Sequence, residues 1–215
     1  MLRMNRKTDE ENEGISAVAG LPVDLGTNGT AMTMENVGKN PAARYARMAV
    51  VLHWIVALLI IALLATGWYM VGTPKNTPER ALFFNLHKSL GIATAFVILT
   101  LIVWRIRHAA PALPTTMPTW ERTAAVLNHR LFYVFMVLVT LAGYLTSSFS
   151  KYGPKLFGIP LPQWGWEDAA LRGNFAAIHR VTALVFAVLI AIHVAAALKH
   201  LLLDKDGVFQ RMLPG

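Results

Sequence analysis

The stretch FAAIHRVTALVFAVLIAIHVAAALKHLLL, residues 175–203, decides the fold of this chain. It is apolar over most of its length, yet it contains His179, His193 and His200. An α-helix turns about 100° and rises about 1.5 Å per residue, so spacings of 14 and then 7 residues place the three histidines on one stripe. The first two lie about 21 Å apart along the helix axis. In a hydrocarbon core about 30 Å thick, they are near opposite sides of the membrane.

Composition assigns the whole chain to the membrane class. Of its 215 residues, 55% are hydrophobic and 15% are charged, a balance typical of membrane-spanning helices. Cysteine is absent, which excludes disulfides, iron–sulfur clusters, thiolate-bound zinc and covalent haem attachment through Cys-x-x-Cys-His. The formal net charge of +8 is assigned to lipid headgroups and topology. Nucleic acid is excluded as a partner, because no basic patch with interleaved aromatic residues appears on a polar face.

Three further apolar segments are predicted to span the membrane: residues 48–70, 81–104 and 124–149. The predicted fold class is therefore all-α, an integral membrane four-helix bundle with membrane lipid around it, formed by residues 41–215. Residues 1–40 are polar and are predicted to be a disordered tail. Residues 150–174, rich in Gly, Pro and Trp, are expected to form an ordered cap on the membrane surface, and residues 204–215 a short polar tail. An excess of Lys and Arg near the ends favours both termini in the cytoplasm.

Four histidines of these spans fall into two pairs of equal depth. In this topology His53 and His193 both lie toward the cytoplasm, whereas His87 and His179 both lie toward the outside. A b-type haem needs two axial imidazoles that face each other in a bundle interior. The two pairs therefore predict two b-type haems, with these histidines as iron ligands, and a path for electrons across the membrane. A hydrogen-bonded or interfacial role is the alternative at each position, although intramembrane ionisable groups are functional candidates by default.

The remaining histidines have more than one interpretation. His108 lies in a polar, proline-rich loop and is expected to be a solvated surface residue. His129 begins the third span, where an interfacial residue and a contact to a haem propionate or a quinone are both consistent with the sequence. His200 continues the stripe near the cytoplasmic boundary, where a quinone-site residue and a boundary residue remain open.

Each span carries a motif, namely RMAVVLHW (47–54), NLHKSLG (85–91), LNHRLFY (127–133) and IHRVTALVFAVLIAIHVAAALKH (178–200), and DKDGVFQRMLP follows at 204–214. Together they resemble the bacterial cytochrome b-561 family, which is related to the cytochrome b subunits of Ni-Fe hydrogenases. The resemblance extends over residues 44–214. It implies four helices that hold two b-type haems through His53, His87, His179 and His193, the same residues as in the depth pairing.

The best understood branch of that family consists of superoxide:ubiquinone oxidoreductases, which this chain resembles in its last span and C-terminal motif. The resemblance implies a protein of the bacterial inner membrane that oxidises superoxide on the periplasmic side and reduces ubiquinone near the cytoplasmic side. It makes His200 the quinone-site histidine and candidate catalytic residue, because an imidazole titrates in the range needed to supply a proton. By analogy, cations of the outer loops would attract the superoxide anion: Lys75, Arg80, Lys88, Lys151, Lys155 and Arg172.

Two other functional classes stay open. One is a haem-containing anchor subunit that passes electrons between quinone and a partner oxidoreductase, since the hydrogenase-type subunits carry similar spans. The other is a small transporter or ion-binding bundle that uses the histidines directly. The near absence of carboxylates inside the spans argues against a proton or metal pathway of this second kind.

Overall fold

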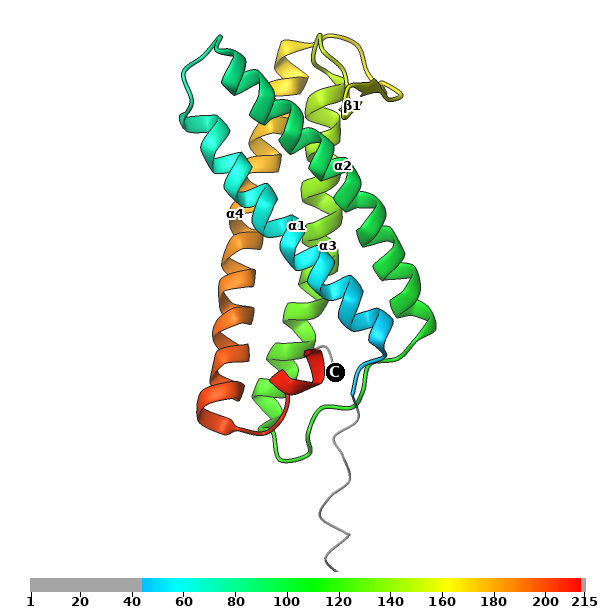
Figure 1. Cartoon of the computed structure of the whole chain (residues 1–215), viewed down its shortest axis with the longest axis vertical. Helices are drawn as coiled ribbons and strands as arrows, with labels where there is room; N and C mark the ends of the chain where they lie inside the picture. Colours follow the sequence, from blue (N-terminus) through cyan, green and yellow to red (C-terminus); the bar gives the residue numbers. More distant parts are fainter. Residues whose placement is uncertain (1–43, 214–215) are drawn as a thin grey trace, which may run out of the picture. The chain divides into compact units, whose positions relative to one another are not determined.

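Four long helices make up most of the computed structural model, which describes residues 44–213. They are α1 (Arg47–Gly72), α2 (Pro78–Arg107), α3 (Thr119–Ser148) and α4 (Ala169–Lys199) (Figure 1). All four are long and apolar enough to cross a membrane, so the predicted all-α, multi-pass class is confirmed. The tail predicted for residues 1–40 lies outside the described residues.

All four helices begin before their predicted spans, and in α2 and α4 a capping residue precedes the apolar run. The Thr77 hydroxyl accepts a hydrogen bond from the Arg80 backbone N–H at 3.2 Å and starts α2. The Asp168 carboxylate accepts from the backbone N–H groups of Ala170 and Leu171, both at 2.9 Å, and starts α4. These caps satisfy N–H groups that have no partner within the helix, so the helices extend beyond the apolar segments.

The helices pack as two hairpins, α1 against α2 and α3 against α4, and α2 also contacts α3. One buried residue from each helix forms the core cluster: Val56, Ile98, Met136 and Phe186. Phe186 lies on α4 midway in sequence between His179 and His193. The apolar core therefore lies between the depths of these two histidines.

The outer faces of the helices are apolar, as contact with lipid requires. Tryptophans mark both ends of the bundle, with Trp68 near the end of α1 and Trp164 and Trp166 between β2 and α4, and with Trp120 at the start of α3. Their exposed fractions range from 63% to 88%, which suits the aromatic belts found at membrane interfaces.

A short β-hairpin caps one end of the bundle, in line with the expectation of an ordered segment after the third span. Strand β1 (Lys155–Leu156) pairs in antiparallel fashion with β2 (Ile159–Pro160). The two turn residues, Phe157 and Gly158, have φ of 48° and 91°, as in a type I′ turn. The buried Ser89 hydroxyl of α2 anchors the hairpin, because it accepts from the Phe157 N–H at 2.8 Å and donates to the Lys155 carbonyl at 3.4 Å.

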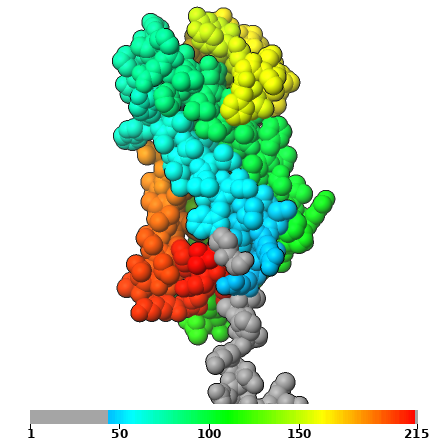
Figure 2. Space-filling model, viewed as in Figure 1, coloured from blue at the N-terminus to red at the C-terminus, as the bar shows by residue number. Residues whose placement is uncertain are grey.

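The short polar tail expected after residue 203 forms helical turns that contact the bundle. The last helix continues as a π-helical turn, η2 (His200–Asp204), and a 3-10 helix, η3 (Phe209–Met212), follows. The Trp54 indole N–H donates to the Met212 carbonyl at 2.7 Å, and the buried Arg211 guanidinium donates to a carbonyl of the α2–α3 connection at 2.7 Å. The C-terminal segment therefore packs beside the start of α1 (Figure 2). We call this end of the bundle the tail end, and the opposite end, with β1 and β2, the hairpin end.

Candidate functional site

His87 of α2 and His179 of α4 lie side by side at the hairpin end, the end of the bundle that carries β1 and β2. Their ring centroids are 6.1 Å apart and their planes are perpendicular, at 90°. Metal–imidazole bonds are about 2 Å long, so a metal ion between two imidazoles separates their centroids by about 6 Å. The spacing of this pair therefore fits two axial ligands of one haem iron.

Hydrogen bonds fix the tautomer of both rings. The Nδ1 atom of His179 lies 2.8 Å from the Val139 carbonyl oxygen on α3. Because a carbonyl can only accept, this Nδ1 carries the proton and Nε2 remains free to bind a metal. The Nδ1 atom of His87 lies 3.1 Å from the Thr66 hydroxyl, which already donates to the Ala62 carbonyl at 2.7 Å. The hydroxyl is therefore free to accept from His87, which gives this ring the same tautomer.

Two glycines provide the space in which these rings lie. A Cβ atom on Gly67 would stand 3.1 Å from Cε1 of His87, and a Cβ atom on Gly143 would stand 3.0 Å from Nδ1 of His179. Both distances are shorter than ordinary van der Waals contact. Each imidazole thus packs directly on the backbone of a neighbouring helix. A side chain at Gly67 or Gly143 would displace the imidazole.

The second pair lies in the half of the bundle nearer the tail end and has a more crowded environment. The ring centroids of His53 on α1 and His193 on α4 are 6.3 Å apart, again a spacing that fits two ligands of one iron. His129 of α3 is closer to His193, at 5.3 Å, and its Nδ1 lies 2.7 Å from the Ala125 carbonyl oxygen. A centroid distance of 5.3 Å is short for an intervening iron, so His129 is placed as a neighbour of the pair. The Phe132 ring also contacts His193, at 5.2 Å.

The structure thus brings together the two pairs that the depth count predicts, while haem ligation by these four histidines remains a prediction. Both pairs offer imidazole nitrogens in largely apolar surroundings, which suit b-type haem. Ligation by two histidines leaves no open iron position, and the chemistry available to such a centre is outer-sphere electron transfer.

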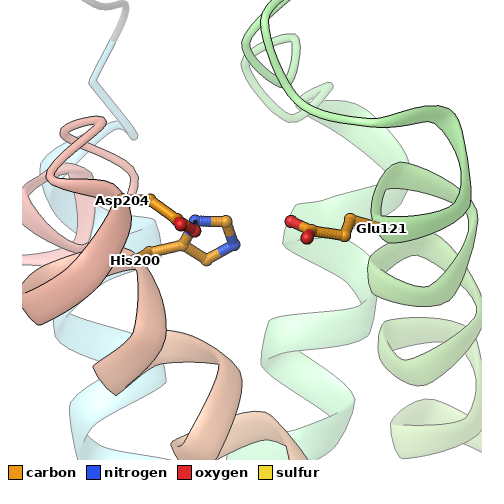
Figure 3. Close-up of side chains that lie close together, drawn as sticks. All are labelled: Glu121, His200 and Asp204. Carbon is orange, nitrogen blue, oxygen red and sulfur yellow. Dashed lines mark ion pairs between the residues drawn. The ribbon is translucent and has the colours of Figure 1, made fainter.

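His200 lies in a cluster of charged groups at the tail end (Figure 3). Its Nδ1 is 2.8 Å from a carboxylate oxygen of Asp206 and 3.1 Å from one of Asp204. One ligand atom each from Glu121, His200 and Asp204 lie within 4.8 Å of one another, the spacing of a metal site. However, the Lys199 ammonium group already bonds to Glu121 at 2.9 Å and to Asp204 at 2.6 Å. A cation of the protein occupies the cluster, so we interpret it as an ion-pair network.

The cations predicted to attract superoxide lie at the hairpin end but differ in their surroundings. Lys88 follows His87 directly, and Ser89 anchors β1, so Lys155 lies close to this part of α2. Arg80 donates to the Thr73 carbonyl at the end of α1, where its role is to cap a helix. The other three are exposed: Lys75, Lys151 and Arg172.

His108, expected to be a solvated surface residue, is exposed and stacks on Trp104 with ring centroids 3.8 Å apart.

The sequence reasoning did not identify the groups that orient the histidines. Thr66 is a hydroxyl residue in an apolar span, and only the glycine that follows it, Gly67, indicates that another side chain packs closely there. Val139 contributes a backbone carbonyl, which no residue type could reveal. Asp206 belongs to the C-terminal motif DKDGVFQRMLP, which contributes to the family resemblance but does not indicate a role for this residue.

Residues 44–215 match the family model described as prokaryotic cytochrome b561, and the chain belongs to this family. It is therefore a multi-pass membrane electron-transfer protein whose cofactor is b-type haem.

Among its relatives is cytochrome b561 homolog 2 of Escherichia coli (strain K12), 31% identical over 189 residues, which are 81% of this chain and 93% of that protein. Cytochrome b561 homolog 1 of the same organism is 26% identical over 175 residues, 80% of this chain and 97% of that protein. A protein named probable superoxide oxidase CybB, from Yersinia pestis, is 25% identical over 174 residues, 80% and 96% of the two chains.

Proposed function

We propose that this protein oxidises superoxide at the hairpin end and reduces ubiquinone at the tail end. Two superoxide anions, one quinone and two protons would give two molecules of dioxygen and one quinol. The observation that carries the proposal is the presence of two histidine pairs at metal-bridging spacing, 6.1 and 6.3 Å, in opposite halves of the bundle. When bound, one haem at each pair would pass single electrons between the two ends.

Residues at the hairpin end suit the capture of a small anion. Lys88 adjoins His87 in sequence, and the Ser89 anchor brings Lys155 to the same part of α2. Such a concentration of positive charge raises the rate at which a small anion arrives. The name of the Yersinia pestis relative, probable superoxide oxidase, supports the same substrate for this chain.

At the tail end, His200 is the group that would supply protons to a quinone. Its Nδ1 is engaged by Asp206, and its Nε2 is the nitrogen left to face a substrate. We place this end at the cytoplasmic side of a bacterial inner membrane, because the excess of Lys and Arg lies there.

The test is a haem count combined with a reaction. Detergent-purified protein is expected to hold two b-type haems per chain by the pyridine haemochrome assay. His179→Ala and His193→Ala should each remove one haem, whereas His108→Ala should remove none. Superoxide supplied with a soluble ubiquinone analogue should reduce the wild-type haems rapidly and form quinol.

Each outcome separates the alternatives. Two haems without a superoxide reaction would refute the proposed donor and favour an anchor subunit that serves a partner oxidoreductase. Loss of both haems from either single variant would refute the proposal that the two histidine pairs bind haem independently. Absence of haem from the wild-type protein would overturn the whole proposal.

A further inference from the structure

The segment after α4 folds so that two carboxylates reach one nitrogen of His200. The π-helical turn η2 is followed by Lys205, whose left-handed backbone (φ 51°) reverses the chain, and the Lys205 N–H bonds to the His200 carbonyl at 2.9 Å. This reversal places Asp204 and Asp206 on the same side of the ring, at 3.1 and 2.8 Å from Nδ1. π-Helical turns of this kind are frequent at functional sites.

Asp206 is the better placed of the two carboxylates. Its second oxygen accepts a hydrogen bond from the Val208 backbone N–H at 3.0 Å, so both of its oxygens have fixed partners. The Asp204 oxygen that faces His200 also bonds to the Lys199 ammonium group, at 2.6 Å. The side chains of Asp206 and His200 are only 19% and 12% exposed, so water screens their contact weakly.

The charged groups that face His200 come from three elements: Glu121 of α3, Lys199 of α4, and the carboxylates of the segment that follows. Lys199 bonds to Glu121 and to Asp204, whereas within residues 44–213 the only cationic partner of Asp206 is His200. The other ring nitrogen, Nε2, points away from Asp204, toward Glu121 (Figure 3).

We propose that Asp206 is a positioning residue for quinone reduction: it holds the proton on Nδ1 of His200 and favours the charged ring, so that Nε2–H is the proton given to the quinone. This inference rests on the proposed function. In each turnover the quinone takes two electrons, which derive from two superoxide anions, and two protons. The Nε2–H bond breaks as the quinone oxygen gains hydrogen, and the ring, left neutral with its proton on Nδ1, regains a proton from water at the tail end. A carboxylate that orients a histidine in this way acts without being protonated itself.

The experiment follows oxidation of the pre-reduced haems by a soluble ubiquinone analogue in stopped flow, from pH 6 to pH 9. In Asp206→Asn the acceptor that holds Nδ1–H and faces the charged ring is lost, so quinone should oxidise the haems more slowly than in the wild type. The loss should be larger at pH 8, where it reaches up to about tenfold, than at pH 6. Oxidation by ferricyanide, which takes no proton, should be unchanged. Lys205→Gln is the matched control, because it removes a charge beside Asp206 and keeps the backbone N–H that bonds to the His200 carbonyl.

Two further variants guard against a merely structural effect. Asp206→Glu keeps a carboxylate and should restore much of the wild-type pH profile. In a His200→Gln background, Asp206→Asn should add no further loss, because the two residues act as one unit. A wild-type pH profile in Asp206→Asn, or failure of Asp206→Glu to improve on Asp206→Asn, overturns the inference. If quinone does not oxidise the wild-type haems at all, the proposed function fails and the inference fails with it.

Discussion

A single added methyl group at Gly143 should selectively weaken the haem site at the hairpin end. In Gly143→Ala the new Cβ would lie 3.0 Å from Nδ1 of His179, where ordinary contact begins near 3.4 Å. The ring must then retreat by a few tenths of an ångström. Its hydrogen bond to the Val139 carbonyl, 2.8 Å long, holds the ring against that movement, so the substitution strains both contacts.

The size of the effect follows from the cost of overpacking, typically about 1–3 kcal/mol. Because about 1.4 kcal/mol corresponds to a factor of ten in affinity, the haem at this pair should bind roughly 5- to 150-fold more weakly. The pair of His53 and His193 contacts neither Gly143 nor its neighbours in the hairpin-end site, so its haem should be retained. The haem count should fall from two toward one per chain.

The assay combines the haem-to-protein ratio after purification with the rate of haem transfer to an excess of apomyoglobin. Gly173→Ala is the matched control, because Gly173 lies on α4, the same helix as His179, and an added Cβ would meet nothing within 4 Å there. Alanine at such an open helical position should stabilise the protein by about 0.4–1 kcal/mol. If Gly143→Ala keeps two haems that dissociate at the wild-type rate, the imidazole of His179 does not occupy the position that the structure assigns to it.

Other substitutions test other contacts. Thr66→Val removes the hydroxyl that holds Nδ1 of His87 and should weaken haem binding at the hairpin end about tenfold, measured by the same haem transfer. Lys155→Gln should lower the superoxide rate about two- to fivefold at low ionic strength and flatten its salt dependence, measured by pulse radiolysis. Trp54→Phe removes the indole bond to the Met212 carbonyl and should lower the free energy of unfolding by about 0.5–1.5 kcal/mol, measured by thermal denaturation of the purified protein.

Each of these substitutions has a control that either keeps the functional group or changes a residue of similar chemistry at another position. Thr66→Ser retains the hydroxyl and should bind haem as the wild type does. Arg44→Gln removes a charge at the tail end and should leave the superoxide rate unchanged. Trp68→Phe alters an indole that is 88% exposed and should leave thermal stability within about 0.5 kcal/mol of the wild type. An equal effect of control and test in any pair would contradict the corresponding contact.

The spans and the pairing of histidines were predictable because both depend on spacing along a helix. A membrane restricts each span to a helix, and a helix converts sequence separation directly into depth. Once residues 175–203 are helical, the depths of His179 and His193 in the membrane are determined by their positions in the sequence. Their partners follow because successive spans cross the membrane in opposite directions.

Contacts that depend on the backbone could not be predicted in this way. The bond from His179 to the Val139 carbonyl depends on the relative rotation of α3 and α4, which spacing does not determine. The turn that brings Asp206 to His200 requires a π-helical segment and a left-handed Lys205, and Lys is not a residue that favours this conformation. The polar sequence of residues 204–215 predicts a short tail and does not show its contacts, which include the bond from Trp54 to Met212 and the bond from the buried Arg211 to the α2–α3 connection.

The arrangement of the pairs couples cofactor binding to assembly of the bundle. The extensive helix contacts lie within the α1–α2 hairpin and within the α3–α4 hairpin, and α2 and α3 connect the two. Each histidine pair, by contrast, joins α4 to a helix of the first hairpin, α1 through His53 and α2 through His87. A ligand that binds only the assembled state stabilises it, by about 2.7 kcal/mol at a hundred times its dissociation constant. Haem bound at both pairs would thus fasten α4 to the first hairpin in both halves of the bundle, so the residues that carry electrons also hold the two hairpins together.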